Sequence, residues 1–308
     1  MVLMSVTVTE GSKMVGMDDQ RTTVAVVSPG YMGAGLGGAL LAGGARVVAT
    51  VAGRSARTGR LAEQAGLELL ATLDDVIAVA DVVLSVTPPA DAIDAAVAIR
   101  AAADRAGVVP LVADLNAVSP ATMERIAAEL KGLVLVDGSI SGPPPSAKPG
   151  ARVYLAGAGA DVVAGLPWAG QVEPVVLRGA VGTASALKMC TGGVYKGLTA
   201  LITQAMRTAG AYGVLDAVVE DLARNGLEQT AGVARSATKA GRFVDEMLEI
   251  SATQESAGLT PELYAAIAAV YRDVAGTPLA GADPEQEREL TAAEVVALLS
   301  QPVGDRPA

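Results

Sequence analysis

The sequence predicts an α/β fold, in which a doubly wound parallel sheet is followed by an all-helical domain. In the first half, short apolar runs alternate with segments of helical spacing, the pattern of a parallel sheet covered on both faces. After about residue 178 the strand-like runs end, and Ala, Leu, Met, Glu and Lys recur at helical spacing. We therefore expect a sheet domain over residues 23–178 and a helical domain over residues 179–300, with a disordered leader (1–22) and a loose tail (301–308).

The first expected elements are a strand, a tight turn, a helix and a second strand. Val24–Val27 is a continuous apolar run, Ala34–Ala42 contains small and apolar residues, and Arg46–Val51 is again largely apolar. Further strands are expected at Leu67–Leu70, Val82–Val86, Leu111–Asp114, Leu133–Val136, Arg152–Gly157 and Val172–Leu177. Helices are expected at Ala56–Ala65, Asp74–Ala80 and Ala90–Ala106, and from Ser119, whose hydroxyl suits the N-cap position before Pro120.

The second half is predicted to contain helices only. They are expected at Thr183–Gly210, Asp216–Arg224, Thr230–Ser251, Pro261–Val274 and Ala292–Leu299. In open α/β sheets, ligands bind beyond the carboxyl ends of the strands, and pockets form preferentially between domains. The active site is therefore expected in the cleft at that edge of the sheet.

The turn after the first strand has the residue types of a dinucleotide-binding motif. It reads Ser28-Pro29-Gly30-Tyr31-Met32-Gly33. Gly30 lets the backbone approach a pyrophosphate, Gly33 lets the helix pack closely on the strand, and the helix N-terminus offers free N–H groups to phosphates. Ser28 stands where the G-x-G-x-x-G pattern has its first glycine. Because a strand precedes this turn and a helix and a second strand follow it, we predict a Rossmann domain that binds a nicotinamide dinucleotide.

The tip of the second strand favours NADP(H) over NAD(H). An NAD site usually places Asp or Glu here to bind the ribose 2′-hydroxyl, whereas this chain has Arg54, Ser55 and Arg57 and no acid. Guanidinium and hydroxyl groups suit a 2′-phosphate; the alternative is that the two arginines only solvate the start of a helix. Residues that follow two later strands are also expected at the cofactor, namely Val86, Thr87, Pro88 and Asn116.

The composition excludes several classes of function. The net charge is −10 and aromatic residues make up 3%, which argues against a nucleic-acid partner. No uninterrupted apolar stretch has transmembrane length, so no membrane partner is expected. A single cysteine, Cys190, fits a reducing compartment such as the cytoplasm.

The absence of histidine narrows the chemistry further. A Ser-His-Asp site, a His-ligated metal and a His general base are all excluded, and we expect no metal. None of the six tyrosines is followed by Lys four residues later, so a Tyr-x-x-x-Lys pair is missing as well. A proton donor must therefore be Lys, Asp, Glu, Tyr or a water molecule.

Lys188 is the first candidate for that donor. It is the single charged residue of the segment Gly182–Thr191, which is otherwise small, apolar or neutral. Desolvation in such surroundings lowers the pKa of a lysine toward neutrality, where it can donate and accept protons. The alternative is a lysine whose ammonium group reaches solvent from a helix that links the two domains.

Three motifs resemble those of the β-hydroxyacid dehydrogenase superfamily, the relatives of 3-hydroxyisobutyrate and 6-phosphogluconate dehydrogenases. The resemblance runs from about Thr23 to Ala275 and includes the glycine turn already described. The family's substrate loop, Asp-x-x-x-Ser-Gly, is matched by Asp137, Ser141 and Gly142. Its catalytic segment, Gly-x-x-x-x-x-Lys-x-x-Asn, is matched by Gly182 and Lys188, with Thr191 in place of the asparagine. The resemblance implies that Lys188 is the general acid and base and that Ser141, Gly142 and Thr191 bind the substrate.

The segment from Lys239 to Ile250 resembles a branch of this family that has a 6-phosphogluconate dehydrogenase-like C-terminal domain. In the family the corresponding helix lies near cofactor and substrate, which makes Lys239 a candidate cofactor ligand and Arg242 a candidate substrate ligand, with Glu246 as a further candidate. Arg242 and Glu246 are four residues apart on one helix face, so a surface ion pair is an equally good interpretation. Tyr195 is a further candidate at the substrate.

Together these features predict an NADP(H)-dependent oxidoreductase that acts on a small hydroxy or carbonyl compound. One alternative is an imine reductase, although the related imine reductases usually have Asp or Tyr where this chain has Lys188. Another is a cofactor-binding sensor without catalysis, against which the presence of both Lys188 and the substrate loop argues. The family buries its helical domain between subunits, and so a homodimer is expected.

Overall fold

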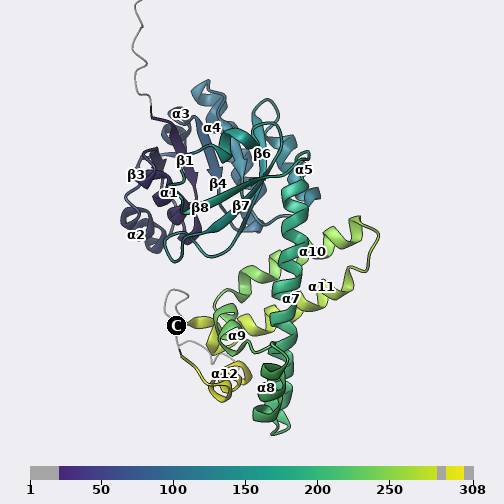
Figure 1. Cartoon of the computed structure of the whole chain (residues 1–308). Helices are drawn as coiled ribbons and strands as arrows, with labels where there is room; N and C mark the ends of the chain where they lie inside the picture. The colour runs from purple at the N-terminus through teal and green to yellow at the C-terminus, as the bar shows by residue number, and fades with distance from the viewer. Residues whose placement is uncertain (1–20, 283–288, 302–308) are drawn as a thin grey trace, which may run out of the picture.

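The computed structural model describes residues 21–282 and 289–301 (Figure 1). A sheet domain lies at the top of the view and a helical domain lies below it. The long helix α7 (Thr183–Ala211) runs from the sheet into the helical domain. The predicted leader lies almost entirely outside the described residues, and so does the predicted tail after residue 301.

The sheet of the described residues has eight strands in the order β3-β2-β1-β4-β5-β6-β7-β8. Neighbouring strands are parallel except for β6 and β7, which are antiparallel. The strands are β1 (Thr23–Val27), β2 (Arg46–Ala49), β3 (Glu68–Leu69), β4 (Val82–Ser85), β5 (Leu111–Asp114), β6 (Val134–Ser141), β7 (Ala151–Ala156) and β8 (Val172–Val176). The doubly wound α/β class predicted from the sequence is confirmed.

Strand β6 differs from its prediction, because it extends to Ser141 instead of ending at Val136. Residues 134–137 pair with β5, and residues 137–141 pair with β7 on the other side. The connection from β6 to β7, residues 142–150, contains no helix that could return the chain for a parallel pairing. Strand β6 therefore carries the Asp137–Ser141 segment beyond the end of β5, beside α7.

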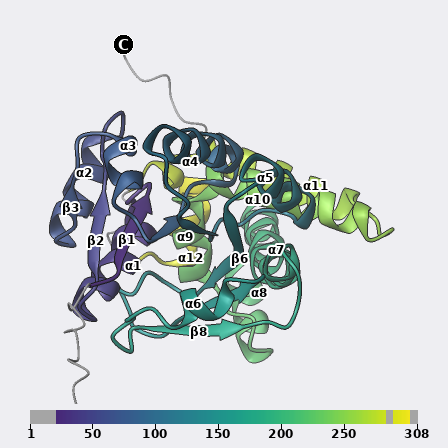
Figure 2. The same ribbon diagram turned by 90° about the horizontal axis from the view of Figure 1, so that it is seen from above.

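Helices cover both faces of the sheet (Figure 2). Val24 and Val26 of β1 point to the face covered by α1 (Tyr31–Ala42), α2 (Ala56–Gln64) and α6 (Ala160–Ala164). Ala25 and Val27 point to the other face, which is covered by α3 (Leu73–Ala78), α4 (Ala92–Ala106) and α5 (Pro120–Glu129). Because both faces are buried, the central strands β1, β4 and β5 are apolar except at their ends, as the sequence suggested.

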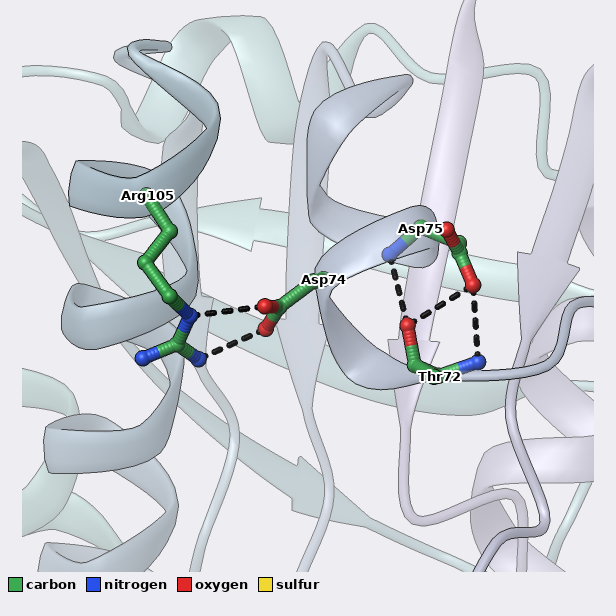
Figure 3. Close-up of polar contacts among 4 residues, drawn as sticks. All are labelled: Thr72, Asp74, Asp75 and Arg105. Carbon is green, nitrogen blue, oxygen red and sulfur yellow. Dashed lines mark hydrogen bonds and ion pairs between the residues drawn. The ribbon is translucent and has the colours of Figure 1, made fainter.

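Local hydrogen bonds fix where α3 begins and how it meets α4 (Figure 3). The Thr72 hydroxyl accepts a hydrogen bond from the Asp75 N–H at 3.1 Å, and the Asp75 carboxylate accepts one from the Thr72 N–H at 3.0 Å. This reciprocal pair is a capping box. Asp74 binds the Arg105 guanidinium of α4 through both carboxylate oxygens, at 2.6 and 2.7 Å. The pair is exposed, so it orients the two helices and adds little stability.

The helical domain packs α7 against α10 and α11, with α8, α9 and α12 at its far end (Figure 1). The further bounds are α8 (Leu215–Arg224), α9 (Thr230–Ala237), α10 (Ala240–Ser256), α11 (Glu262–Ala275) and α12 (Ala292–Ser300). One helix was expected over Thr230–Ser251, but the chain breaks it at Thr238 and Lys239. The Thr238 hydroxyl donates to the Arg235 carbonyl at 3.0 Å, a local bond that competes with the helical pattern.

Candidate active site

The glycine turn joins β1 to α1 with the backbone that the motif requires. Ser28 has a φ of +66°, a left-handed conformation that favours glycine, which explains why the motif usually has glycine at this position. A Cβ atom on Gly33 would lie 2.7 Å from the Ser28 carbonyl oxygen, so only glycine fits there. Gly30 is the N-cap of α1, and no side chain caps that helix. The first N–H groups of α1 are therefore available to an anion.

This turn forms one wall of a cavity of about 430 Å³. The opposite wall comes from the junction of α9 and α10 in the helical domain. The lining residues are Ser28, Gly30, Tyr31, Met32, Gly33, Arg57, Thr87, Pro88, Thr238, Lys239, Gly241 and Arg242. Three of them are cations and none is a carboxylate, so the cavity suits a ligand with several negative charges.

Most of the residues predicted at the cofactor line this cavity, together with Arg242, which was predicted at the substrate. Thr238 and Gly241 also line it and were not predicted; their place at the break between two helices is their only signal in the sequence. Pro29, Arg54, Ser55, Val86 and Asn116 are not among its lining residues. The Ser55 hydroxyl accepts from the Thr58 N–H as the N-cap of α2.

Asn116 is buried behind the cavity and supports its edge. Its side-chain oxygen accepts a hydrogen bond from the Thr87 N–H at 2.6 Å. Its side-chain nitrogen donates to Asp114 at 2.7 Å and to Ser85 at 3.1 Å. Thr87 and Pro88 are thus held in place by the strand next to their own.

Asp137, the first residue of the substrate-loop motif, fixes the start of α7. Its carboxylate accepts hydrogen bonds from the N–H groups of Gly182, Ala184 and Ser185, and from the Ser185 hydroxyl at 2.7 Å. Burial raises the pKa of Asp137, while these hydrogen bonds act in the opposite direction. The residue therefore attaches the N-terminus of α7 to the middle of β6.

Lys188 lies one turn beyond that cap and points back to β6. Its Nζ donates to the Ile140 carbonyl oxygen at 2.6 Å. Burial, followed by the positive charge of Arg242, lowers the pKa of Lys188 to about 8. The side chain is partly buried and does not extend freely into solvent.

The remaining residues predicted at the substrate come from two segments of the chain, the end of β6 before Lys188 and the part of α7 after it. Ser141 and Gly142 directly follow Ile140, and Gly142 has a φ of +120° that favours glycine. The Thr191 hydroxyl donates to the Leu187 carbonyl of its own helix at 3.1 Å. Tyr195 is 69% exposed.

Arg242 and Glu246 belong to a larger ionic cluster between α7 and α10. The Glu246 carboxylate, which is only 6% exposed, contacts Arg242 Nε at 3.2 Å and also pairs with Lys196 Nζ. Lys196 Nζ and the Arg242 guanidinium lie 4.8 and 5.5 Å from the centre of the Phe243 ring. Glu246 and Lys196 are thus largely buried, whereas the Arg242 side chain is 51% exposed, so Arg242 and Glu246 form one part of a three-residue cluster instead of an isolated surface pair. Lys196 was not among the predicted site residues.

Two family models match the chain. The first, the NAD binding domain of 6-phosphogluconate dehydrogenase, matches residues 23–167. The second, a domain of unknown function (DUF1932), matches residues 209–274. Residues 23–167 thus resemble the NAD-binding domain of 6-phosphogluconate dehydrogenase, and residues 209–274 resemble the DUF1932 domain.

Individual proteins and structures are also similar to this chain. An uncharacterised 28.5 kDa protein of Methanothermus fervidus is 29% identical over 184 residues, which are 59% of this chain and 67% of that protein. The structure of the conserved protein MTH1747, described as similar to 3-hydroxyacid dehydrogenases, is 25% identical with a TM-score of 0.61, covering 82% of this chain and 96% of that one. The 3-hydroxyisobutyrate dehydrogenase of Salmonella typhimurium shares the fold with a TM-score of 0.64 at 18% identity, over 90% of this chain and 99% of that one.

The match over residues 23–167 and the similarity to MTH1747 indicate that the sheet domain is an NAD(P)-binding domain of the dehydrogenase type. Within residues 21–282 and 289–301 no helix is both long and apolar enough to cross a membrane.

Proposed function

We propose that this chain is an NADP(H)-dependent oxidoreductase that transfers a hydride between nicotinamide and a carbon of a small hydroxy or carbonyl compound, with Lys188 as general acid and base. The observation that carries the proposal is the position of Lys188. Its Nζ lies at the carboxyl end of β6, 2.6 Å from the Ile140 carbonyl, with a pKa lowered to about 8. A group that titrates near neutral pH at this edge of the sheet suits acid–base catalysis.

The cavity between the two domains fits a nicotinamide dinucleotide. The uncapped N-terminus of α1, the open space beside Gly30 and the absence of carboxylates among its lining residues all suit a pyrophosphate. The glycine turn, Val86, Thr87, Pro88, Asn116 and Lys239 would hold or support the cofactor. Arg54, Ser55 and Arg57 would contact a 2′-phosphate, which favours NADP(H). When bound, the cofactor supplies the hydride or accepts it.

Lys188 supplies the proton chemistry. In reduction, its ammonium donates a proton to the carbonyl oxygen as negative charge develops there. In oxidation, its neutral amine accepts the proton of the hydroxyl group. The Ile140 carbonyl keeps the Nζ in place, and the nearby charge of Arg242 favours the neutral amine.

The substrate is proposed to bind beside Lys188. Ser141 and Gly142 directly follow Ile140, so an acidic group of the substrate bound to them would lie near the Lys188 amine. Arg242 offers a further positive charge within electrostatic range of Lys188. Thr191 and Tyr195 are proposed as further contacts from α7. A small hydroxy acid fits this set of groups.

The experiment is a substrate panel with purified protein, following the absorbance of reduced nicotinamide. The panel contains small hydroxy acids, the corresponding carbonyl acids, and imines. Turnover of a hydroxy acid or carbonyl acid is the expected result. Turnover of imines alone would replace the proposal by imine reduction, and tight cofactor binding with no turnover at all would favour a sensor.

We further propose that the chain acts as a homodimer in the cytoplasm. The single cysteine fits a reducing compartment. Along α7 and the turn after it, Val194, Tyr195, Leu201 and Tyr212 are between 61% and 80% exposed, which is unusual for large apolar side chains along one helix. A second copy that covers them would bury more than about 2,000 Å² if the dimer is obligate. A monomeric mass by light scattering at micromolar concentration would contradict this.

A further inference from the structure

A row of buried polar side chains crosses the carboxyl ends of three neighbouring strands. Ser85 of β4 lies opposite Asp114 of β5, and Asp114 lies opposite Asp137 of β6. All three are at most 1% exposed. Because side chains alternate along a strand, the row shares the face of Val83 and Val112, which is covered by α3, α4 and α5. Asp137 caps the N-terminus of α7, but the proposed mechanism assigns no role to Asp114.

The contacts of Asp114 determine which way the Asn116 amide points. Its two carboxylate oxygens accept from the Asn116 N–H at 3.1 Å and from the Asn116 side-chain nitrogen at 2.7 Å. The same nitrogen reaches the Ser85 hydroxyl at 3.1 Å, and that hydroxyl also bonds to Asp114. A carboxylate can only accept hydrogen bonds, so the amide nitrogen must face Asp114 and the amide oxygen must face away. That oxygen accepts from the Thr87 N–H at 2.6 Å.

This series of hydrogen bonds, from Asp114 through Asn116 to Thr87, ends at the cavity. Thr87 and Pro88 line it, opposite the junction of α9 and α10. The Thr87 hydroxyl is buried and has no hydrogen-bond partner within the part of the chain that the structure describes. A buried hydroxyl without a partner is costly, and a ligand in the cavity is one way to satisfy it. The position of Thr87 thus depends on Asn116, and the orientation of Asn116 depends on Asp114.

We propose that Asp114 is a positioning residue for the cofactor: its carboxylate orients Asn116, which holds the Thr87–Pro88 edge, so that the deprotonated protein binds the nicotinamide cofactor more tightly than the protonated protein does. This inference rests on the proposed function, because it assumes that the cavity binds this cofactor. A protonated carboxyl carries a hydrogen on one oxygen, so it accepts the two Asn116 hydrogen bonds less strongly than the carboxylate does. The Asn116 amide is then held mainly by Ser85 and Thr87, and the Thr87 edge is less firmly fixed.

The surroundings of Asp114 place this change near neutral pH. Burial raises the pKa of Asp114 to about 7, although the hydrogen bonds from Asn116 and Ser85 lower it. The charged group that faces it is the Asp137 carboxylate on β6, which raises the pKa further, while β4 presents the neutral Ser85. The chain contains no histidine that would titrate in the same range.

The test is the dissociation constant of NADPH between pH 6 and pH 8.5, measured by fluorescence titration. For the parent protein we expect binding to tighten as pH rises through about 7, by at most tenfold per pH unit for a single proton. Asp114→Asn should bind weakly with a flat profile. Ser85→Ala removes a donor to the carboxylate and should move the midpoint to higher pH. The 2′-phosphate itself titrates near pH 6, so the series is repeated with NADH, which lacks that group.

The matched control is Asp81→Asn. Asp81 accepts a hydrogen bond from the Thr23 N–H at 2.8 Å at the opposite end of the same sheet, so this variant should keep the parent profile. A flat profile of the parent protein with both cofactors, or a parent-like profile in Asp114→Asn, would overturn the inference. If Asp114→Asn does not fold, an unchanged midpoint in Ser85→Ala overturns it instead. Failure to bind either cofactor at any pH would overturn the proposed function as well, a result distinct from pH-independent binding.

Discussion

The two walls of the cavity are built in different ways. The sheet wall consists of the glycine turn and the segment after β4, where backbone conformation and the hydrogen bonds of Asn116 fix the geometry. The helical wall comes from the junction of α9 and α10, where Arg242 contacts the Glu246 carboxylate, which also pairs with Lys196 of α7 behind the wall. The first wall can be recognised along one stretch of sequence, whereas the cluster behind the second exists only because two distant helices pack together.

The largest effect is expected at Lys188, which bonds to the Ile140 carbonyl of β6 and is not among the residues that line the cavity. Lys188→Met keeps the length of the side chain and removes its proton, so turnover should fall by roughly 10²–10⁴-fold, while NADPH affinity and thermal stability stay close to those of the parent. Steady-state kinetics and a cofactor titration check both parts. Lys131→Met, at the opposite end of the sheet, serves as the control. Substantial turnover by Lys188→Met would remove Lys188 from the mechanism and direct attention to Lys196 or Lys239.

The helical wall is tested at Glu246. Glu246→Gln keeps the shape of the side chain but leaves Lys196 and Arg242 without their shared carboxylate, so the free energy of unfolding should fall by about 3–5 kcal/mol. Urea unfolding followed by circular dichroism measures it. Glu173→Gln, which breaks an exposed pair with Arg152, should change stability very little. Equal effects of the two substitutions would mean that the buried cluster is no more important than a surface pair.

The cofactor preference tests the sheet wall. A charge-assisted contact with the 2′-phosphate favours NADPH over NADH by roughly tenfold to a hundredfold, and Arg54→Ala and Arg57→Ala should each reduce that preference. Dissociation constants for both cofactors give the ratio directly. Arg60→Ala, on the same helix as Arg57 and exposed, should leave it unchanged. A parent protein that binds the two cofactors equally would contradict the assignment of NADP(H).

The smallest expected effect is the change that the charge of Arg242 makes to the pH dependence of the reaction rate. Because burial, and to a smaller extent the charge of Arg242, lower the pKa of Lys188 to about 8, the oxidation rate should rise as pH passes through 8, and the reduction rate should fall over the same range, by at most tenfold per pH unit. Removing the charge in Arg242→Met raises the Lys188 pKa, so the pH–rate curves for oxidation and for reduction should both move to higher pH. Rates measured in both directions with saturating cofactor check this. If the two pH–rate curves do not move in Arg242→Met, Arg242 does not influence the pKa of the acid–base group.

The sequence by itself determined the order of strands and helices, the dinucleotide turn and the position of Lys188. These features depend on residues close together in the chain: an apolar run makes a strand, Ser28 to Gly33 make the turn, and Gly182 to Thr191 surround one lysine with neutral residues. The break of the expected helix at Thr238 and Lys239 was missed, because neither of these residues is a glycine or a proline.

Only the tertiary structure decided how β6 pairs and which charges meet. The strand gained the Asp137–Ser141 segment because β7 was available as an antiparallel partner, and that extension places Ile140 beside Lys188. Lys196 and Glu246 are fifty positions apart, and their ion pair depends on the packing of α7 against α10. Residue spacing predicts neighbours within one helix or strand, but contacts between elements depend on strand register and helix packing, which are set by the burial of the whole core.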